Sequence, residues 1–199
     1  MDCRKGDPKT TNAALQVQKQ ADGTWTLNGS TCTRPAKPVV TAAMVRDRVV
    51  RLIPSASLGL APHDSTLVNI QTIMWVNAPK NRTLAPLTIL GQRVTVTLTL
   101  DHVDWSFGDG QNTTTTSPGR AYDNAHHPCR TRTCPGYFGH VYTRSGSRTL
   151  HATASWTARF SVNGAAAVAI PGTVAGPTAA SGLAVKQARS VLVPNPGQH

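Results

Sequence analysis

The sequence contains no glutamate, and all nine of its acidic residues are aspartate. Helical bundles and coiled coils carry glutamate, lysine, leucine and alanine along their helices, so this absence argues against both architectures. The 199 residues also contain no apolar run near the roughly 18 residues that a membrane-spanning helix needs. Full disorder is disfavoured as well, because Val, Ile, Leu and Trp recur in ordered alternation. A chain of this length typically forms one domain of ~100–150 residues with additional segments.

Threonine, glycine and proline are plentiful instead, and apolar residues alternate with polar ones along several segments. Residues 93–100 read RVTVTLTL, in which Val and Leu occupy one face of a strand and Thr the other. This period of two is typical of a half-buried antiparallel strand. Residues 150–162 repeat the pattern over a longer stretch, and Asn163-Gly164 after them is a strong hairpin turn. Several such strands separated by turn residues predict a mainly β protein with an antiparallel β-sandwich.

Three parts are expected along the chain. Residues 1–37 form an N-terminal segment with a hairpin that turns at Asp22-Gly23. Residues 38–66 form one helix followed by a Pro-rich linker, because the apolar residues of TAAMVRDRVVRLI repeat with a helical period until Pro54. Residues 67–199 form the sandwich, and its connection 111–139 is too long for an ordinary hairpin loop. We call residues 111–139 the insert.

Four cysteines form two pairs that are local in the sequence, Cys3 with Cys32 and Cys129 with Cys134. An even number suits two disulfides and an oxidising compartment, although three pairings exist and the sequence does not choose among them. A competing interpretation makes Cys129 and Cys134 zinc ligands. Their spacing to the neighbouring histidines matches no common zinc module, so we expect disulfides, with free thiols as a third alternative. The histidines considered as further zinc ligands are His126, His127 and His140.

Motifs for catalysis and cofactor binding are absent from the sequence. It has no G-x-S-x-G, S-x-x-K, H-E-x-x-H or G-x-x-x-x-G-K-[ST] pattern. Asp101 and Asp104 are three residues apart on a strand, so their side chains face opposite ways unless a bulge intervenes. Together with Asp109 they form no D-x-D-x-D-G calcium loop. We therefore expect no catalytic, cofactor-binding or metal-binding residue, and no enzymatic activity.

Positive charge is in excess, with 20 Lys and Arg and a formal net charge of +11. Some of it gathers in or beside the insert, and within the insert Asp123 is the only acidic residue. This cluster has two interpretations, a contact surface for polyanions and a solvated basic face. Nucleic-acid binding is less favoured because no DNA-binding motif is present and few aromatic residues, Tyr122, Tyr137 and Phe138, lie nearby. The clustered arginines are Arg120, Arg130, Arg132, Arg144 and Arg148.

The hexapeptide WSFGDG at 105–110, followed by H-V-Y at 140–142 and a glycine at 146, resembles the PKD domain. More narrowly, the chain is similar to secreted and cell-surface PKD-domain proteins of actinobacteria. The resemblance covers roughly residues 67–193 and implies an immunoglobulin-like sandwich, while the insert and the first 60 residues depart from it. The residues that carry the motif are Trp105, Phe107, Gly108, Asp109, Gly110, His140, Tyr142 and Gly146.

These motif residues have structural explanations. Trp105 and Phe107 project to the same side of a strand and fill the core of the sandwich. Asp109 accepts hydrogen bonds from the N–H groups of its turn, where glycines adopt backbone angles closed to other residues. Tyr142 ties its hydroxyl to nearby backbone in the manner of a tyrosine corner.

The resemblance also bears on compartment and function. The N-terminus, MDCRKGDPKTTNAAL, lacks the apolar stretch of a signal peptide, so a signal lies upstream of Met1, or the chain is a mature fragment, or the protein is cytosolic. The resemblance favours the first two, and hence an extracytoplasmic location. We expect a non-catalytic module for binding, adhesion or spacing at the bacterial cell envelope, without a cofactor. Its partner would be an anionic wall polymer or another envelope protein. The alternatives are an accessory domain or enzyme acting on such a polymer, and a basic nucleic-acid-binding protein.

Overall fold

The computed structural model describes residues 12–22, 25–33 and 38–188. Contacts within the chain divide it into two units, residues 1–39 and residues 40–199. In the first unit, β1 (Asn12–Lys19) pairs antiparallel with β2 (Trp25–Thr33), with an irregularity between Leu15 and Val17. This is the hairpin that the sequence predicts around Asp22. The predicted pairing of Cys3 with Cys32 lies outside the described residues and side chains.

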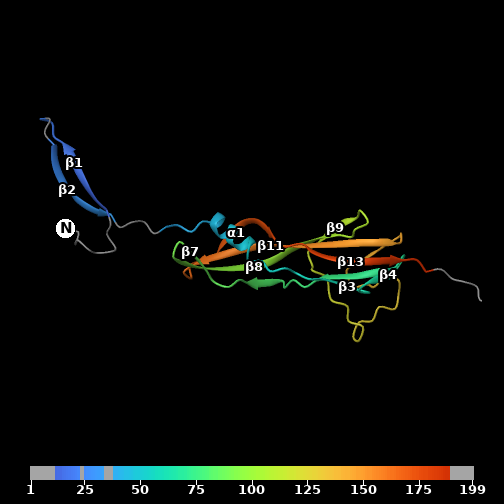
Figure 1. The fold of residues 1–199 in the computed structure, drawn as a ribbon. Coiled ribbons are helices and arrows are strands. Elements are labelled where there is room, and N and C mark those ends of the chain that lie inside the picture. The colour runs from blue at the N-terminus through green and yellow to red at the C-terminus, as the bar shows by residue number, and fades with distance from the viewer. Residues whose placement is uncertain (1–11, 23–24, 34–37, 189–199) are drawn as a thin grey trace, which may run out of the picture. The chain divides into compact units, whose positions relative to one another are not determined.

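The second unit is mainly β and is built on two long strands, β8 (Gln92–Ser106) and β11 (Gly146–Val162). They pair antiparallel along most of their length, and Figure 1 shows them running through the body of this unit. They are the middle of an eight-stranded sheet with the order β4–β13–β11–β8–β6, in which β12 also pairs with β11, and β7 and β9 with β8. The bounds of the shorter strands are β4 (Ser65–Leu67), β6 (Asn81–Thr83), β7 (Leu87–Ile89), β9 (Asn112–Thr115), β12 (Val168–Ala175) and β13 (Ala179–Lys186).

A smaller antiparallel sheet has the order β10–β5–β3. Its strands are β3 (Leu58–Ala61), β5 (Gln71–Val76) and β10 (Gly139–Val141). Side chains from both sheets and from the helix α1 (Ala42–Val50) share one apolar core, which includes Val49, Met74, Leu98 and Trp105. The predicted β-sandwich arrangement is therefore confirmed at this coarse level.

Helix α1 begins at Thr41, whose hydroxyl accepts a hydrogen bond from the Met44 N–H as an N-cap. Its Arg46 guanidinium donates to the carbonyl oxygens of Pro171 at 2.7 Å and Thr173 at 2.8 Å. These carbonyls lie where β12 loses register with β11. Arg46 therefore supplies donors to carbonyls of an irregular strand and ties the helix to it.

Strand β8 contains a bulge at Asp101. Leu100 pairs with Trp156 of β11 and His102 pairs with Ser155, which leaves Asp101 without a partner. Apolar burial accordingly changes from even positions, up to Leu100, to odd positions from Val103 onward. Val103, Trp105 and Phe107 thus do not continue the alternation of residues 93–100 in the same parity, and this change is visible in the sequence. The bulge keeps both halves of one strand facing the same core.

The linker predicted over 54–66 contains two strands, and the sandwich begins at Leu58 rather than at residue 67. Gly59 pairs with Trp75 of β5, and a Cβ atom at Gly59 would overlap the Trp75 indole. The glycine is therefore required by packing, and its presence does not indicate a flexible linker. At the other end, β13 begins at Ala179 and ends at Lys186, and residues from 189 onward lie outside the described part.

The hydrogen bonds from Arg46 to β12 predict that two arginines of helix α1 contribute differently to stability. Arg46→Met keeps an apolar stem but removes both hydrogen bonds, and should lower the free energy of unfolding by about 1–3 kcal/mol. Arg48→Met, at an exposed position of α1, should change it by less than about 0.5 kcal/mol. Urea denaturation of the two variants checks this. Equal losses of stability in the two variants would contradict a stabilising role for the Arg46 hydrogen bonds.

Candidate functional site

The WSFGDG turn is fixed to the H-x-Y segment by the hydroxyl of Tyr142. This hydroxyl donates to the Phe107 carbonyl at 3.0 Å, and the Tyr142 side chain is buried. Burial raises the pKa of the hydroxyl, which keeps it a neutral donor. Trp105 and Phe107 are also buried, and the Trp105 indole N–H donates to the Thr115 hydroxyl at 2.9 Å. The structure thus places Tyr142 against backbone far from it in sequence.

Asp109 and His140 form the second link between these segments. His140 Nε2 lies 2.7 Å from Asp109 Oδ2, and the two side chains are only 10% and 14% exposed. The imidazole stacks on Phe107, with ring centroids 4.1 Å apart, and meets Tyr142 edge-on. Burial raises the pKa of Asp109, but hydrogen bonds from His140 and the Gln111 N–H outweigh it and hold that pKa below 3.8. Since the insert lies between Asp109 and His140, their contact closes its two ends.

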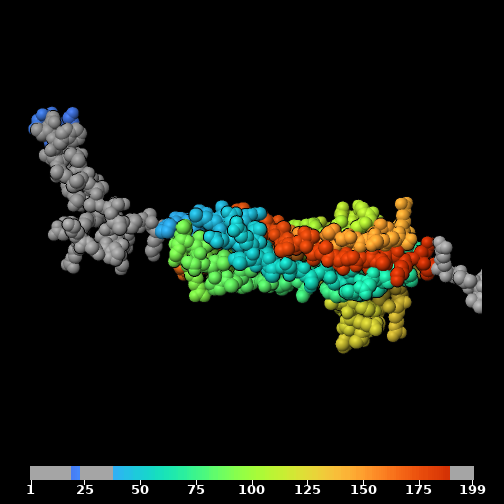
Figure 2. Space-filling model, in the orientation of Figure 1, coloured from blue at the N-terminus to red at the C-terminus, as the bar shows by residue number. Residues whose placement is uncertain are grey.

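The insert is docked on strand β5 by main-chain hydrogen bonds. The N–H groups of Gln71, Met74 and Val76 donate to carbonyls of Arg132, Phe138 and Pro118 at 2.9, 2.9 and 2.7 Å. The Phe138 ring also packs on Trp105, with centroids 4.5 Å apart. In Figure 2 the segment coloured yellow forms a knob that projects from the body of the unit. The insert is therefore an ordered projection with an anchored base.

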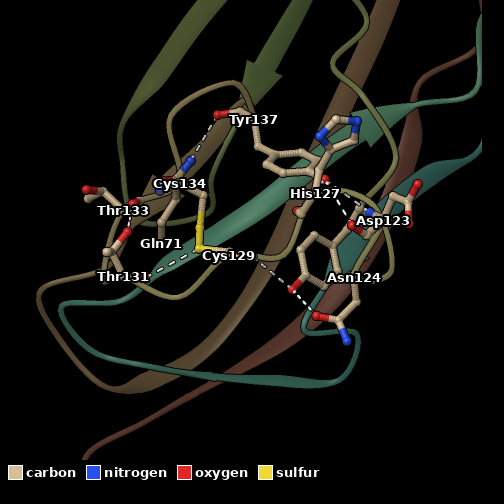
Figure 3. Close-up of a disulfide and its surroundings, with 10 residues drawn as sticks. Gln71, Asp123, Asn124, His127, Cys129, Thr131, Thr133, Cys134 and Tyr137 are labelled. Atoms are coloured by element: carbon tan, nitrogen blue, oxygen red, sulfur yellow. Dashed lines mark hydrogen bonds between the residues drawn. A yellow bond between two sulfur atoms is a disulfide. The ribbon is translucent and has the colours of Figure 1, made fainter.

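The Cys129–Cys134 disulfide, predicted from the local spacing, is confirmed, with Cα atoms 5.5 Å apart. Beside it, the side-chain oxygen of Gln71 accepts from the Cys134 N–H at 2.6 Å, and its nitrogen donates to the Tyr137 carbonyl at 3.1 Å (Figure 3). Gln71 was not singled out by the sequence, because its partners lie more than 60 residues away. Both cysteine sulfurs are oxidised, so the zinc interpretation does not apply to this pair.

Polar and aromatic side chains fix the rest of the insert internally. The Tyr137 hydroxyl donates to the His127 carbonyl at 3.0 Å, and the Tyr137 ring meets Tyr122 edge-on at 5.5 Å (Figure 3). Asp123 accepts from the backbone and the ring of His126, and this backbone hydrogen bond is the largest cause that lowers the pKa of Asp123. The insert's aromatic rings therefore serve internal packing, which leaves little of them for stacking on bases.

The five clustered arginines do not converge on one site. Arg120 lies over the Tyr137 ring, 5.2 Å from its centroid, and Arg130 and Arg132 are exposed on the insert. Arg148 is half-buried and donates to the carbonyls of Arg144 and Ser145. Arg144 and Arg148 line one hollow of about 280 Å³ beside Asp109, whereas Arg130 lines another of about 440 Å³ beside the disulfide. None of the five forms an ion pair with a described carboxylate.

The bulge in β8 brings Asp101 and Asp104 to the same histidine, which is the exception allowed for in the expectation that they face opposite ways. His102 Nδ1 lies 2.6 Å from Asp101 and its Nε2 lies 3.3 Å from Asp104. The hydrogen bond to Asp101 is the largest cause that raises the pKa of His102 above 6.5. Within the described residues no cluster of three or more His, Cys or Asp side chains is arranged to hold a metal ion.

Comparisons with known proteins assign neither a family nor a function to this chain. No protein-family model matches the chain, and searches of curated proteins and of solved structures find no significant match. Across the part of the chain that the structure describes, no helix has the length and apolar character needed to cross a membrane.

The WSFGDG turn contains two glycines with different surroundings. Substitution by alanine should therefore lower the stability by different amounts at the two positions. Both have positive φ, 74° at Gly108 and 91° at Gly110, so alanine at either should cost about 1–2 kcal/mol of stability. A Cβ atom at Gly108 would in addition lie 2.5 Å from the Thr149 carbonyl oxygen, whereas one at Gly110 meets nothing within 4 Å. Chemical denaturation should find Gly108→Ala clearly less stable than Gly110→Ala. The reverse order would contradict the described turn.

The contacts of His102 predict a pH-dependent contribution to stability. Because its pKa is raised in the folded state, its stabilising effect is complete below the ordinary value of 6.5 and is lost as the pH rises through the folded pKa. His102→Gln should therefore cost more stability at about pH 5.5 than at about pH 9. The control is His151→Gln, an exposed histidine of β11. Urea unfolding across this pH range measures the effect. A loss of stability in His102→Gln that does not depend on pH would refute the prediction.

Proposed function

We propose that this chain is a non-catalytic, extracytoplasmic binding module of immunoglobulin-like, PKD type whose insert contacts an anionic polymer of the cell envelope. The observation that carries the proposal is the insert itself. It is an ordered projection, closed at its ends and docked on β5, and it bears exposed arginines that form no ion pair with any carboxylate in the described residues. Loops held on a rigid scaffold are the usual place for binding residues.

The strand arrangement supports the immunoglobulin-like type. The sheet β3–β5–β10 faces a second sheet in which β9, β8, β11 and β13 follow one another, and β4 joins β13 in parallel. Two antiparallel sheets around one core, with a buried tyrosine bonded to backbone, are features of such sandwiches. The WSFGDG and H-x-Y motifs meet in this core through Phe107, His140 and Tyr142.

Electrostatics support a polyanion as the partner. Arg120, Arg130 and Arg132 lie on the insert, and its one aspartate, Asp123, is already bonded to His126 and to backbone N–H groups. Uncompensated surface charge of one sign raises the local concentration and the association rate of oppositely charged partners. Because the backbone of the insert is already ordered, binding costs little further conformational entropy.

The disulfide supports the extracytoplasmic location. Disulfides persist in oxidising compartments and are rare in the cytosol. Cys129 and Cys134 close a short loop within the arginine-bearing part of the insert. A module that depends on this bond for the shape of its contact surface fits a secreted or envelope-attached protein better than a cytosolic nucleic-acid-binding protein.

Binding of soluble linear polyphosphate at several salt concentrations tests the proposal. Affinity should fall steeply as salt rises, because counterions are released from the polyanion. The double variant Arg130→Gln, Arg132→Gln should reduce the slope of log affinity against log salt by about two. The matched control is Arg82→Gln, Arg93→Gln, which removes two exposed arginines outside the insert. Unchanged binding by the insert variant, or equal losses in both variants, would count against the insert as the contact surface.

A further inference from the structure

A second feature of the insert is an apolar hollow beneath it, with a volume of about 490 Å³. One wall is formed by Ala61 and Ile73 of the smaller sheet, together with Ile70 just before β5. The opposite wall belongs to the insert and includes the disulfide and Tyr122. Pockets for small molecules typically have volumes of about 300–1,000 Å³ and are lined mainly by apolar groups. The hollow falls within this description.

The apolar hollow is separate from the core of the sandwich. Ile73 is only 3% exposed but is not part of the main core, which receives its β5 neighbours Met74 and Val76. The insert covers Ile73 on the opposite side of the sheet, and Cys134 is buried there as well. The insert therefore builds a small apolar compartment of its own, and only part of that compartment is filled by protein.

Positive charge adjoins this compartment directly. The neighbouring hollow of about 440 Å³, which contains Arg130, shares Cys129, Thr131 and Cys134 with the apolar one. Arg130 is exposed and forms no ion pair with a described carboxylate. The apolar hollow and the hollow with Arg130 thus border the same disulfide, and Figure 3 shows Gln71 beside this bond.

We propose that the apolar hollow binds the hydrocarbon chain of an anionic amphiphile, a fatty carboxylate, whose carboxylate meets Arg130. A guanidinium binds a carboxylate through two parallel N–H···O hydrogen bonds. The chain occupies the space between β5 and the disulfide and removes its methylene groups from water. The carboxylate contact rests on the proposed function, since it uses an arginine of the same surface, whereas the hollow does not depend on it.

Calorimetric titration of the full chain with hexanoate, octanoate and decanoate below their micelle concentrations tests this. Each buried methylene should improve affinity about four-fold until the hollow is full. Ala61→Phe places a large ring in the hollow and should weaken octanoate binding by about ten-fold or more. Ala169→Phe, at an exposed alanine of β12, is the matched control and should not change binding. Ile70→Gln, at a residue that is 36% exposed, is a second variant that leaves the core untouched.

A neutral ligand of equal chain length distinguishes binding in the hollow from the contact with Arg130. Arg130→Gln should weaken octanoate binding by up to about five-fold and leave 1-octanol binding unchanged. Affinity that does not depend on chain length, or indifference to both Ala61→Phe and Ile70→Gln in folded protein, would overturn the hollow as the site. Retained chain-length dependence with no effect of Arg130→Gln would overturn the arginine contact instead. The polyphosphate titration reports on the proposed function separately.

Discussion

The contact between Asp109 and His140 is the constraint on which the rest of the site depends. It joins the end of the WSFGDG turn to the start of the H-x-Y segment, and together with the Tyr142 hydroxyl it fixes both to Phe107. A carboxylate so little exposed is costly unless it is hydrogen-bonded, and Asp109 meets this condition through His140 and the Gln111 N–H. This contact holds the two ends of the insert together at the edge of the sandwich.

The entropic cost of closing a flexible loop grows only slowly with its length, so the length of the insert adds little to the cost of closure. Ordering its backbone carries a further entropic cost, which contacts must offset. Order within the insert comes from the pairing of β9 with β8, from local contacts and from three main-chain hydrogen bonds to β5, with the Gln71 side chain bridging two of its backbone groups. This order makes the insert a defined surface for its exposed arginines and lets it enclose a hollow. Both proposed binding properties follow from one docked segment.

Much of the framework could be predicted from local patterns. The alternation in 93–100 and 150–162, the first hairpin and the Cys129–Cys134 pairing all depend on residues close in sequence, and the structure contains them. The bulge at Asp101 was predictable in principle, because apolar positions change parity there. The strands within 54–66 were missed because Gly59 serves a long-range contact with Trp75. The roles of Gln71 and of the Asp109–His140 pair depend on partners that only the fold brings near.

The central claim is that the insert is docked on β5 as an ordered part of the unit. Native-state amide hydrogen exchange at Gln71, Met74 and Val76 tests it most directly, because these three N–H groups donate to carbonyls of the insert. The account predicts protection at all three amides that approaches that of core amides in β8 and β11. Exchange at the rate of an unstructured peptide, while β8 and β11 stay protected, would contradict it.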